Sequence, residues 1–217
     1  MYKRISPLLV RLVVLFTSCL IISNILANRM IQVGAWSLDA GNLLFPVTYI
    51  LSDMFSEVYG YQWSRRVTWW AASMNLLFAI LVAVTNWLPA PDYFDPEPFK
   101  LALGSSFRIV VASLISYVVG DLVNDKVFRK MREGKKVMQG FTSRAILSSF
   151  VGQIVDSTLF VTIAFAGTMP LSELASMIVV NIVVKMAYEV IILPVTSQVT
   201  QKIYMKELNY QKRRHNK

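Results

Sequence analysis

The chain has 217 residues, of which 55% are hydrophobic and only 16% are charged, and its net charge is +9. A soluble domain is usually about 25% charged, so this composition excludes a soluble protein and indicates an integral membrane protein. The single cysteine excludes an intrachain disulfide, and the single histidine lies in a basic tail, so neither a His/Cys metal site nor a metal cofactor is expected. No glycine-rich phosphate-binding motif is present, so the chain carries no nucleotide-driven motor.

Six stretches are apolar and long enough to cross a bilayer, which takes about 20 residues of helix. We predict an all-α integral membrane protein with a single domain, a bundle of six transmembrane helices followed by a basic tail at residues 200–217. The predicted spans are Pro7–Ala27, Gly41–Tyr59, Val67–Leu88, Leu101–Leu122, Arg144–Gly167 and Leu174–Val199.

The loops between these stretches alternate in charge. Basic residues gather at the N-terminus, in the second and fourth loops and in the tail, whereas the other three loops carry mainly acids, Asp39 among them. Because cytoplasmic loops are rich in Lys and Arg, we predict a multi-pass protein of the cell (inner) membrane with both termini cytoplasmic. The positive charge then serves topology and contact with anionic membrane lipid, and not nucleic-acid binding.

The second predicted span carries two acids, Asp53 and Glu57, four residues apart on one helix face, with Tyr49 one turn earlier. Ionisable residues inside spans are costly and usually functional. The alternatives are an ion pair with a neighbouring helix for Asp53 and contact with headgroup water for Glu57. Pro46 has no backbone N–H near the start of this span, and this could leave backbone carbonyls free to bind a ligand.

Three later spans also carry buried polar groups. Arg108 in the fourth span could bind a carboxylate or a substrate carbonyl, or extend outward to the headgroups. Gln153 and Asp156 lie three residues apart on one face of the fifth span.

The sixth span contains Lys185 and Glu189, four residues apart, with Asn181 one turn before them. These two charges could neutralise each other locally. Alternatively, Lys185 is the counter-charge to Asp53 or Asp156 across the bundle, because two buried carboxylates need a cation or a proton. Pro194 is expected to break this helix near its inner end.

Together these residues predict a polar cavity inside the bundle. Ionised carboxylates only accept hydrogen bonds, so they match a flat ligand with paired N–H donors, such as the edge of a guanine-like base, and a tyrosine could supply a stacking face. The predicted substrate-binding residues are Tyr49, Asp53, Glu57, Arg108, Gln153, Asp156, Asn181, Lys185 and Glu189.

Four stretches resemble one known family, the queuosine precursor transporters, also called vitamin uptake transporters. They are "FPVTYILSDMFSEVYGY" with the "RR" that follows, "SSFRIVVASLISYVVGDLVNDKVF", "GQIVDSTLF" and "VNIVVKMAYEVIILP". The resemblance implies import of 7-cyano-7-deazaguanine, 7-aminomethyl-7-deazaguanine or queuine for tRNA modification, by secondary transport or facilitated diffusion. It also leaves room for a homodimer. Some relatives have a basic residue at the position of Glu57 and Asn at that of Gln153.

Three other functions compete with a self-sufficient carrier. The main alternative is a substrate-binding subunit that docks on an ATP-driven energy-coupling complex through its basic cytoplasmic loop. A membrane-embedded enzyme lacks a His, a Cys pair or a nucleophile motif to support it, so we predict that the protein is not an enzyme. A simple ion channel fits poorly with so many different polar residue types in the spans.

Overall fold

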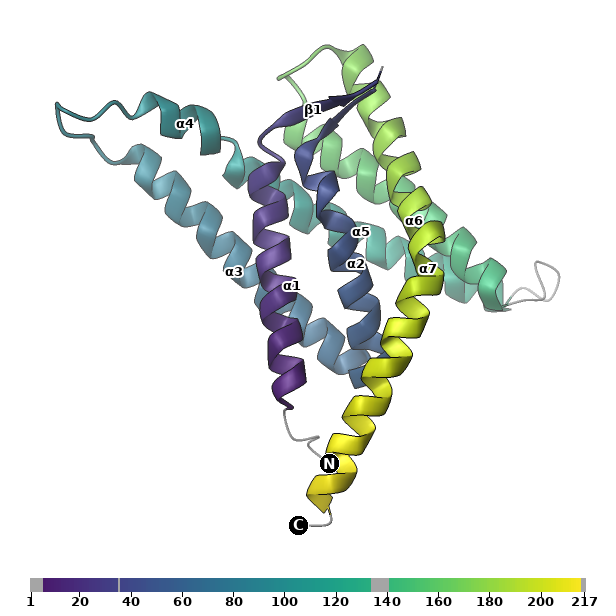
Figure 1. The fold of residues 1–217 in the computed structure, drawn as a ribbon. Coiled ribbons are helices and arrows are strands. Elements are labelled where there is room, and N and C mark those ends of the chain that lie inside the picture. Colours follow the sequence, from purple (N-terminus) through teal and green to yellow (C-terminus); the bar gives the residue numbers. More distant parts are fainter. Residues whose placement is uncertain (1–5, 35, 134–140, 216–217) are drawn as a thin grey trace.

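The computed structural model describes residues 6–34, 36–133 and 141–215, and most of them are helical (Figure 1). Five helices are long and apolar enough to cross a membrane, at Pro7–Leu26, Gln62–Trp87, Glu97–Asn124, Leu147–Phe165 and Leu171–Ile191. These five agree with the first and the last four predicted spans, and they identify a multi-pass membrane protein. The long helices are α1 (Pro7–Leu26), α3 (Tyr61–Trp87), α5 (Ser106–Glu133), α6 (Phe141–Phe165) and α7 (Leu171–His215).

The second predicted span is not one uniform helix. It begins with the 3₁₀ turn η1 (Ala40–Leu43), continues as the ten-residue α-helix α2 (Phe45–Met54) and ends in the π-helix η2 (Phe55–Tyr59). Pro46 lies in the first turn of α2, where its missing N–H costs nothing. Gly60 ends the segment with a φ of +86°, a left-handed conformation that favours glycine.

A two-stranded antiparallel hairpin follows α1, where the prediction had only a loop. Strand β1 (Met30–Val33) pairs with β2 (Trp36–Asp39), with Met30 opposite Asp39. Isolated two-stranded hairpins are marginal in water, but β2 packs against α7 and buries Leu38 and Asp39. The mostly helical chain agrees with the predicted all-α class, and this short hairpin is the part of it that the sequence did not predict.

Several helices extend beyond their predicted bounds, because hydropathy marks only the part of a helix that lies in lipid. The fourth span is divided into α4 (Glu97–Leu103) and α5, which continues to Glu133. Helix α7 continues through Pro194 to His215. The predicted break at Pro194 is wrong, since a single proline removes one backbone hydrogen bond but need not end a long helix. Residues 200–215 of the predicted basic tail are part of the same helix.

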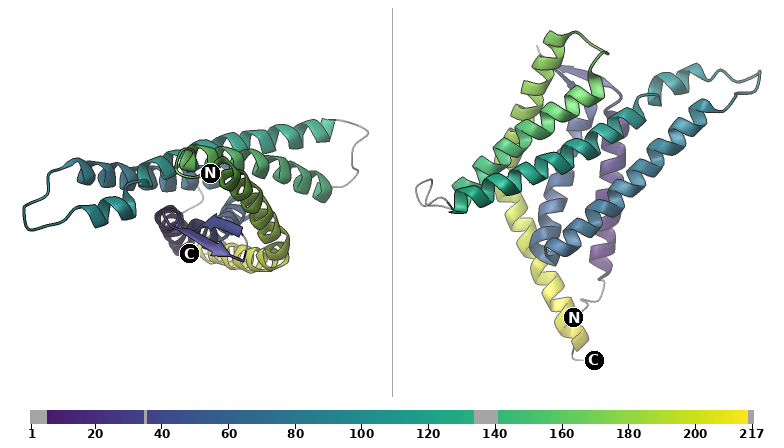
Figure 2. Two further views of the ribbon diagram at one scale, coloured as in Figure 1. Left: turned by 90° about the horizontal axis from the view of Figure 1, so that it is seen from above. Right: turned by 180° about the vertical axis from the view of Figure 1, so that it is seen from behind.

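The helices form two layers. In Figure 2, α3, α5 and α6 lie on one side, and α1, α2 and α7 lie on the other. Helix α1 begins and α7 ends at one end of the molecule, whereas the hairpin and the α6–α7 turn lie at the opposite end (Figure 1).

Two apolar clusters hold these layers together. Near the chain ends, Phe16 of α1, Phe55 of η2 and Val67 of α3 form the centre of one cluster. Near the hairpin end, Ile109 of α5, Val161 of α6 and Met177 of α7 form the centre of the other. The polar side chains that matter most lie along the helices between these clusters.

Candidate substrate-binding site

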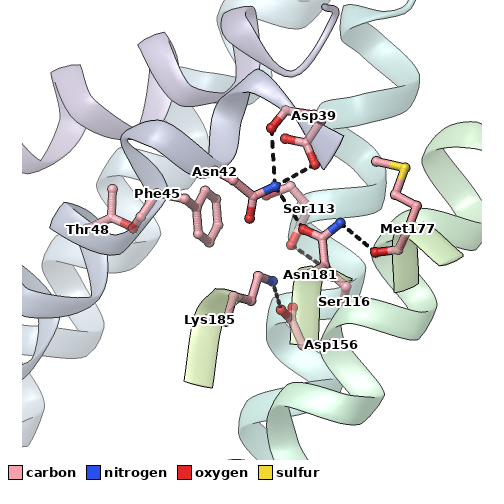
Figure 3. A network of polar contacts seen from close by, with 10 residues as sticks. All are labelled: Asp39, Asn42, Phe45, Thr48, Ser113, Ser116, Asp156, Met177, Asn181 and Lys185. Atoms are coloured by element: carbon pink, nitrogen blue, oxygen red, sulfur yellow. Dashed lines mark hydrogen bonds and ion pairs between the residues drawn. The ribbon is translucent and has the colours of Figure 1, made fainter. Parts of the chain in front are cut away.

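A buried polar pocket lies between the two layers, below the hairpin (Figure 3). Residues of α1, β2, η1, α2, α5, α6 and α7 line it. The pocket is lined by Ser23, Asn24, Ala27, Asp39, Gly41, Asn42, Phe45, Ser113, Ser116, Asp156, Phe160, Asn181 and Lys185.

An ion pair joins α6 to α7 at the base of this pocket. Lys185 Nζ lies 2.6 Å from Asp156 Oδ2, and the two residues are only 8% and 9% exposed. The lysine ammonium also lies 5.4 Å from the centre of the Phe45 ring, within the range of a cation–π interaction. The predicted pairing of Lys185 across the bundle is therefore confirmed, with Asp156 as its partner.

An amide chain joins the end of the hairpin to α7. Asn42 Nδ2 donates to Asp39 Oδ2 and to Asn181 Oδ1, each at 2.8 Å. Asn181 Nδ2 in turn donates to the Met177 carbonyl at 3.0 Å. This chain holds η1 over the pocket and orients the Asp39 carboxylate, which is 2% exposed (Figure 3).

Gly41 permits the close contact between η1 and α1. A Cβ at this position would lie 2.7 Å from the Ser23 carbonyl oxygen and 2.8 Å from Asp39 Oδ1. The hydroxyl of Ser23 donates back to the Gly41 carbonyl at 2.9 Å. Glycine thus lets the backbone that carries Asp39 and Asn42 approach α1 at this level of the bundle.

Two glycines bring α5 and α6 together beside Asp156. A Cβ at Gly120 would lie 2.9 Å from the Asp156 Cβ, and one at Gly152 would lie 3.0 Å from the Asn124 Cβ. Small residues of this kind allow membrane helices to pack closely. The crossing determines how far Asp156 reaches toward Lys185.

The cavity itself is small, about 20 Å³, which is enough for roughly one water molecule. Pockets that hold small-molecule ligands measure about 300–1,000 Å³. The structure is therefore a closed arrangement, and a heterocycle fits only after side chains or η1 have moved.

Asp39 differs electrostatically from Asp156. Burial raises the pKa of the Asp39 carboxyl to about 6, and the nearby Lys185 charge and the backbone N–H groups of Gly41 and Asn42 oppose that rise. Its closest side-chain partner is a neutral amide, whereas Asp156 is in contact with a cation.

Five of the predicted site residues lie in or beside this pocket. Asp156, Lys185 and Asn181 line it. Gln153 lies one turn from Asp156 on α6, and its buried Oε1 has no hydrogen-bond partner. Glu189 is half-buried, one turn beyond Lys185 on α7.

Of the other four predicted residues, Arg108 and Glu57 lie away from the pocket. Arg108 donates to the carbonyls of Ile163 and Ala166, both at 2.6 Å, at the C-terminal end of α6. Glu57 is exposed on η2. Tyr49 and Asp53 lie in α2, but their side chains are outside the described part of the structure.

Sequence reasoning missed Asp39, Asn42 and Phe45, because it assigned Asp39 to an outer loop and read the next segment as uniform apolar helix. The available signal was the run "DAGN" directly before that segment, where polar residues favour turns and helix starts. Ser113 and Ser116, three residues apart on α5, gave a weaker signal. Among the described residues, no three His, Cys, Asp or Glu side chains gather closely enough to hold a metal ion.

Apolar helices that enclose a buried charged pocket define a class, the multi-pass membrane proteins that handle small polar molecules. A family model described as "Putative vitamin uptake transporter" matches residues 39–199, and the chain belongs to this family of membrane transporters. The match begins at Asp39 and includes every charged residue that lines the pocket.

Three curated proteins are similar to this chain. A "Probable queuosine precursor transporter" of Bacillus subtilis is 21% identical over 79% of this chain and 76% of its own length. A protein of the same description from Haemophilus influenzae is 28% identical over 58% of this chain and 51% of its own length. The "Queuosine precursor transporter" of Escherichia coli is 22% identical over 66% of this chain and 62% of its own length. No solved structure matches the chain.

Proposed function

We propose that this transporter imports guanine-like precursors of queuosine, such as 7-cyano-7-deazaguanine and 7-aminomethyl-7-deazaguanine, by secondary transport or facilitated diffusion. The names of the three similar proteins support this substrate class. The chemistry of the pocket supports it independently, as follows.

The observation that carries the proposal is the set of hydrogen-bonding groups buried at one level of the membrane. Asp39 and Asp156 are carboxylate acceptors, and Asn42 and Asn181 offer both donors and acceptors. The edge of a guanine ring presents adjacent N–H donors that a carboxylate can accept in pairs. Phe45 adds an aromatic face beside the pocket, against which a flat ring can stack.

Within this proposal Asp156, Lys185 and Asn181 contact the substrate. Gln153 lies one turn from Asp156 on α6, and Glu189 lies one turn beyond Lys185 on α7. That Asp53 and Tyr49 of α2 also bind substrate stays a prediction from the sequence. Because Lys185 Nζ lies 2.6 Å from Asp156 Oδ2, a substrate that binds Asp156 must share this carboxylate with Lys185 or displace it.

The test is uptake of radiolabelled 7-aminomethyl-7-deazaguanine by cells that cannot make queuosine and have no other carrier. We expect uptake that depends on this chain and the appearance of queuosine in tRNA. Asp156→Asn, at equal amounts in the membrane, should reduce uptake at least about tenfold, the effect of losing one charge-assisted hydrogen bond. Asp95→Asn is the matched control, because Asp95 lies in an exposed loop.

Two results would contradict the proposal. Cells with the chain in the membrane but no uptake of either deazaguanine would exclude this substrate class. Uptake that requires an added ATP-driven coupling complex would instead identify a substrate-binding subunit. Normal transport by Asp156→Asn would not contradict the proposed substrate class, but it would show that Asp156 is not part of the binding site.

A further inference from the structure

The charges that line the pocket do not balance. Two carboxylates, Asp39 and Asp156, face it together with one ammonium, that of Lys185. Lys185 lies 2.6 Å from Asp156, and its charge also acts on Asp39. Among the described lining residues there is no second cation, so these residues together carry a charge of −1 when they are ionised.

The surrounding elements do not supply the missing positive charge. From α1 and α5 the pocket receives only neutral groups, Ser23, Asn24, Ser113 and Ser116. Glu189 lies one turn beyond Lys185 and is itself acidic. Arg108 is held by the carbonyls at the end of α6 and does not line the pocket.

An uncompensated charge inside a membrane protein is costly, so such a site favours a ligand that brings the opposite charge. Asp156 already has a cation. Asp39 forms no ion pair among the described residues: its Oδ2 accepts from the neutral amide of Asn42, and its other hydrogen bonds come from backbone N–H groups.

We infer that the pocket selects for a guanine-like ligand carrying one positive charge, and that Asp39 is the specificity-determining residue that receives it. This inference rests on the proposed function. Of the two precursors, it favours 7-aminomethyl-7-deazaguanine, which has a primary ammonium on a short arm, over 7-cyano-7-deazaguanine, whose nitrile is neutral.

The preference should depend on pH in a defined direction. The pKa of Asp39 is raised to about 6, so its carboxylate is ionised at pH 7.5 and largely protonated at pH 5. A primary alkylammonium has an ordinary pKa near that of lysine, about 10, so the ligand keeps its charge at both values. The preference for the charged ligand is therefore present above pH 6 and declines as the pH falls through 6.

The experiment uses the full chain in proteoliposomes, with uptake of labelled 7-aminomethyl-7-deazaguanine competed by three unlabelled ligands. These are the 7-aminomethyl compound itself, the 7-cyano compound and 7-hydroxymethyl-7-deazaguanine, a neutral analogue of similar size. At pH 7.5 the aminomethyl ligand should compete at least about tenfold better than either neutral ligand, the ratio expected for a charge-assisted contact to a buried carboxylate. At pH 5 that ratio should shrink toward one.

Asp39→Asn removes the carboxylate but keeps an acceptor, and the ratio should then be near one at both pH values. Asp95→Asn should keep the wild-type ratio and its pH dependence. Should Asp39→Asn fail to insert, Asp39→Glu, which keeps the carboxylate, should keep the preference at pH 7.5, and the unaltered chain should lose it at pH 5. A preference that persists unchanged at pH 5 overturns the inference.

The inference and the proposed function fail in different ways. Equal competition by the nitrile and the ammonium compound at pH 7.5 overturns the inference alone, since the aminomethyl compound is then still taken up and the site binds both ligands equally well. A preference that survives Asp39→Asn overturns the role of Asp39. Uptake of neither compound overturns the proposed function and this inference with it.

Discussion

Asp156 and Lys185 stabilise the bundle as a pair, whatever else they bind. Both are almost fully buried and lie 2.6 Å apart, so removing one leaves the other charge without its nearest partner. Breaking a buried pair costs about 3–5 kcal/mol, whereas replacing both members with neutral residues is often tolerated.

We therefore expect Asp156→Asn and Lys185→Met each to lower the thermal stability of the purified protein in detergent. The double variant should recover most of that stability but no transport. The measurement is a double-mutant cycle on melting temperature, with uptake assayed in parallel. Stability losses that simply add in the double variant would show that the two side chains do not act as a pair.

Arg108 was predicted to bind substrate, but its guanidinium contacts two backbone carbonyls at the end of α6. Carbonyls in the last turn of a helix have no partner within the helix, and a cation there also complements the helix dipole. Arg108→Gln should therefore cost about 1.5 kcal/mol of stability and leave the KM for uptake unchanged. A raised KM at unchanged stability would restore the binding role.

At the scale of the elements, the crossing of α5 and α6 controls the position of Asp156. Because a methyl group at Gly120 would lie 2.9 Å from the Asp156 Cβ and 3.2 Å from the Gly152 carbonyl oxygen, the helices must separate to admit it. Overpacking of this kind typically costs about 1–3 kcal/mol.

Gly120→Ala should reduce uptake as well as stability, since the carboxylate moves with its helix. Ile115→Val is the control, because it also changes one methyl group on α5 but at a position that is 44% exposed. Unchanged uptake in Gly120→Ala would mean that the crossing tolerates the shift without affecting the pocket.

The segmented second span explains how one end of the pocket is built. At one end of this segment Asn42 lines the pocket, and at the other end Phe55 packs against Phe16, with the rings edge to face at 5.7 Å. The tight η1 turn and the wide η2 turn change the winding at either end of α2. Such departures from α-helix often mark functional sites.

At the scale of the whole molecule, α1 begins and α7 ends at the same end (Figure 1). The basic residues predict that this end faces the cytoplasm. The pocket then lies nearer the outer end, below the hairpin.

This orientation can be tested by cysteine labelling after Cys19, the only cysteine in the chain, has been changed to Ser. A membrane-impermeant maleimide should label Tyr93→Cys in intact cells, because Tyr93 is 92% exposed in the α3–α4 loop. Met205→Cys, near the end of α7, should be labelled only after the membrane is permeabilised. The reverse pattern would invert the topology.

The sequence alone determined the class of protein, five of the spans and three residues that line the pocket, Asp156, Asn181 and Lys185. These follow from local physics, because length and hydropathy report which stretches prefer lipid, and a charge within such a stretch is too costly to lie there without a role. The partner of Lys185 could not be predicted from the sequence, because an ion pair between helices depends on how segments far apart in the sequence pack.

Tertiary structure alone decided the rest of the site. Asp39 and Asn42 come from a turn that looks like an outer loop, and only the close approach at Gly41 and the amide contact with Asn181 carry them into the membrane interior. From the sequence, Arg108 was a candidate substrate-binding charge. In the structure it donates to backbone carbonyls at the end of α6. The contact between Asn42 and Asn181 joins residues 139 positions apart, and no local sequence pattern predicts a contact over such a separation.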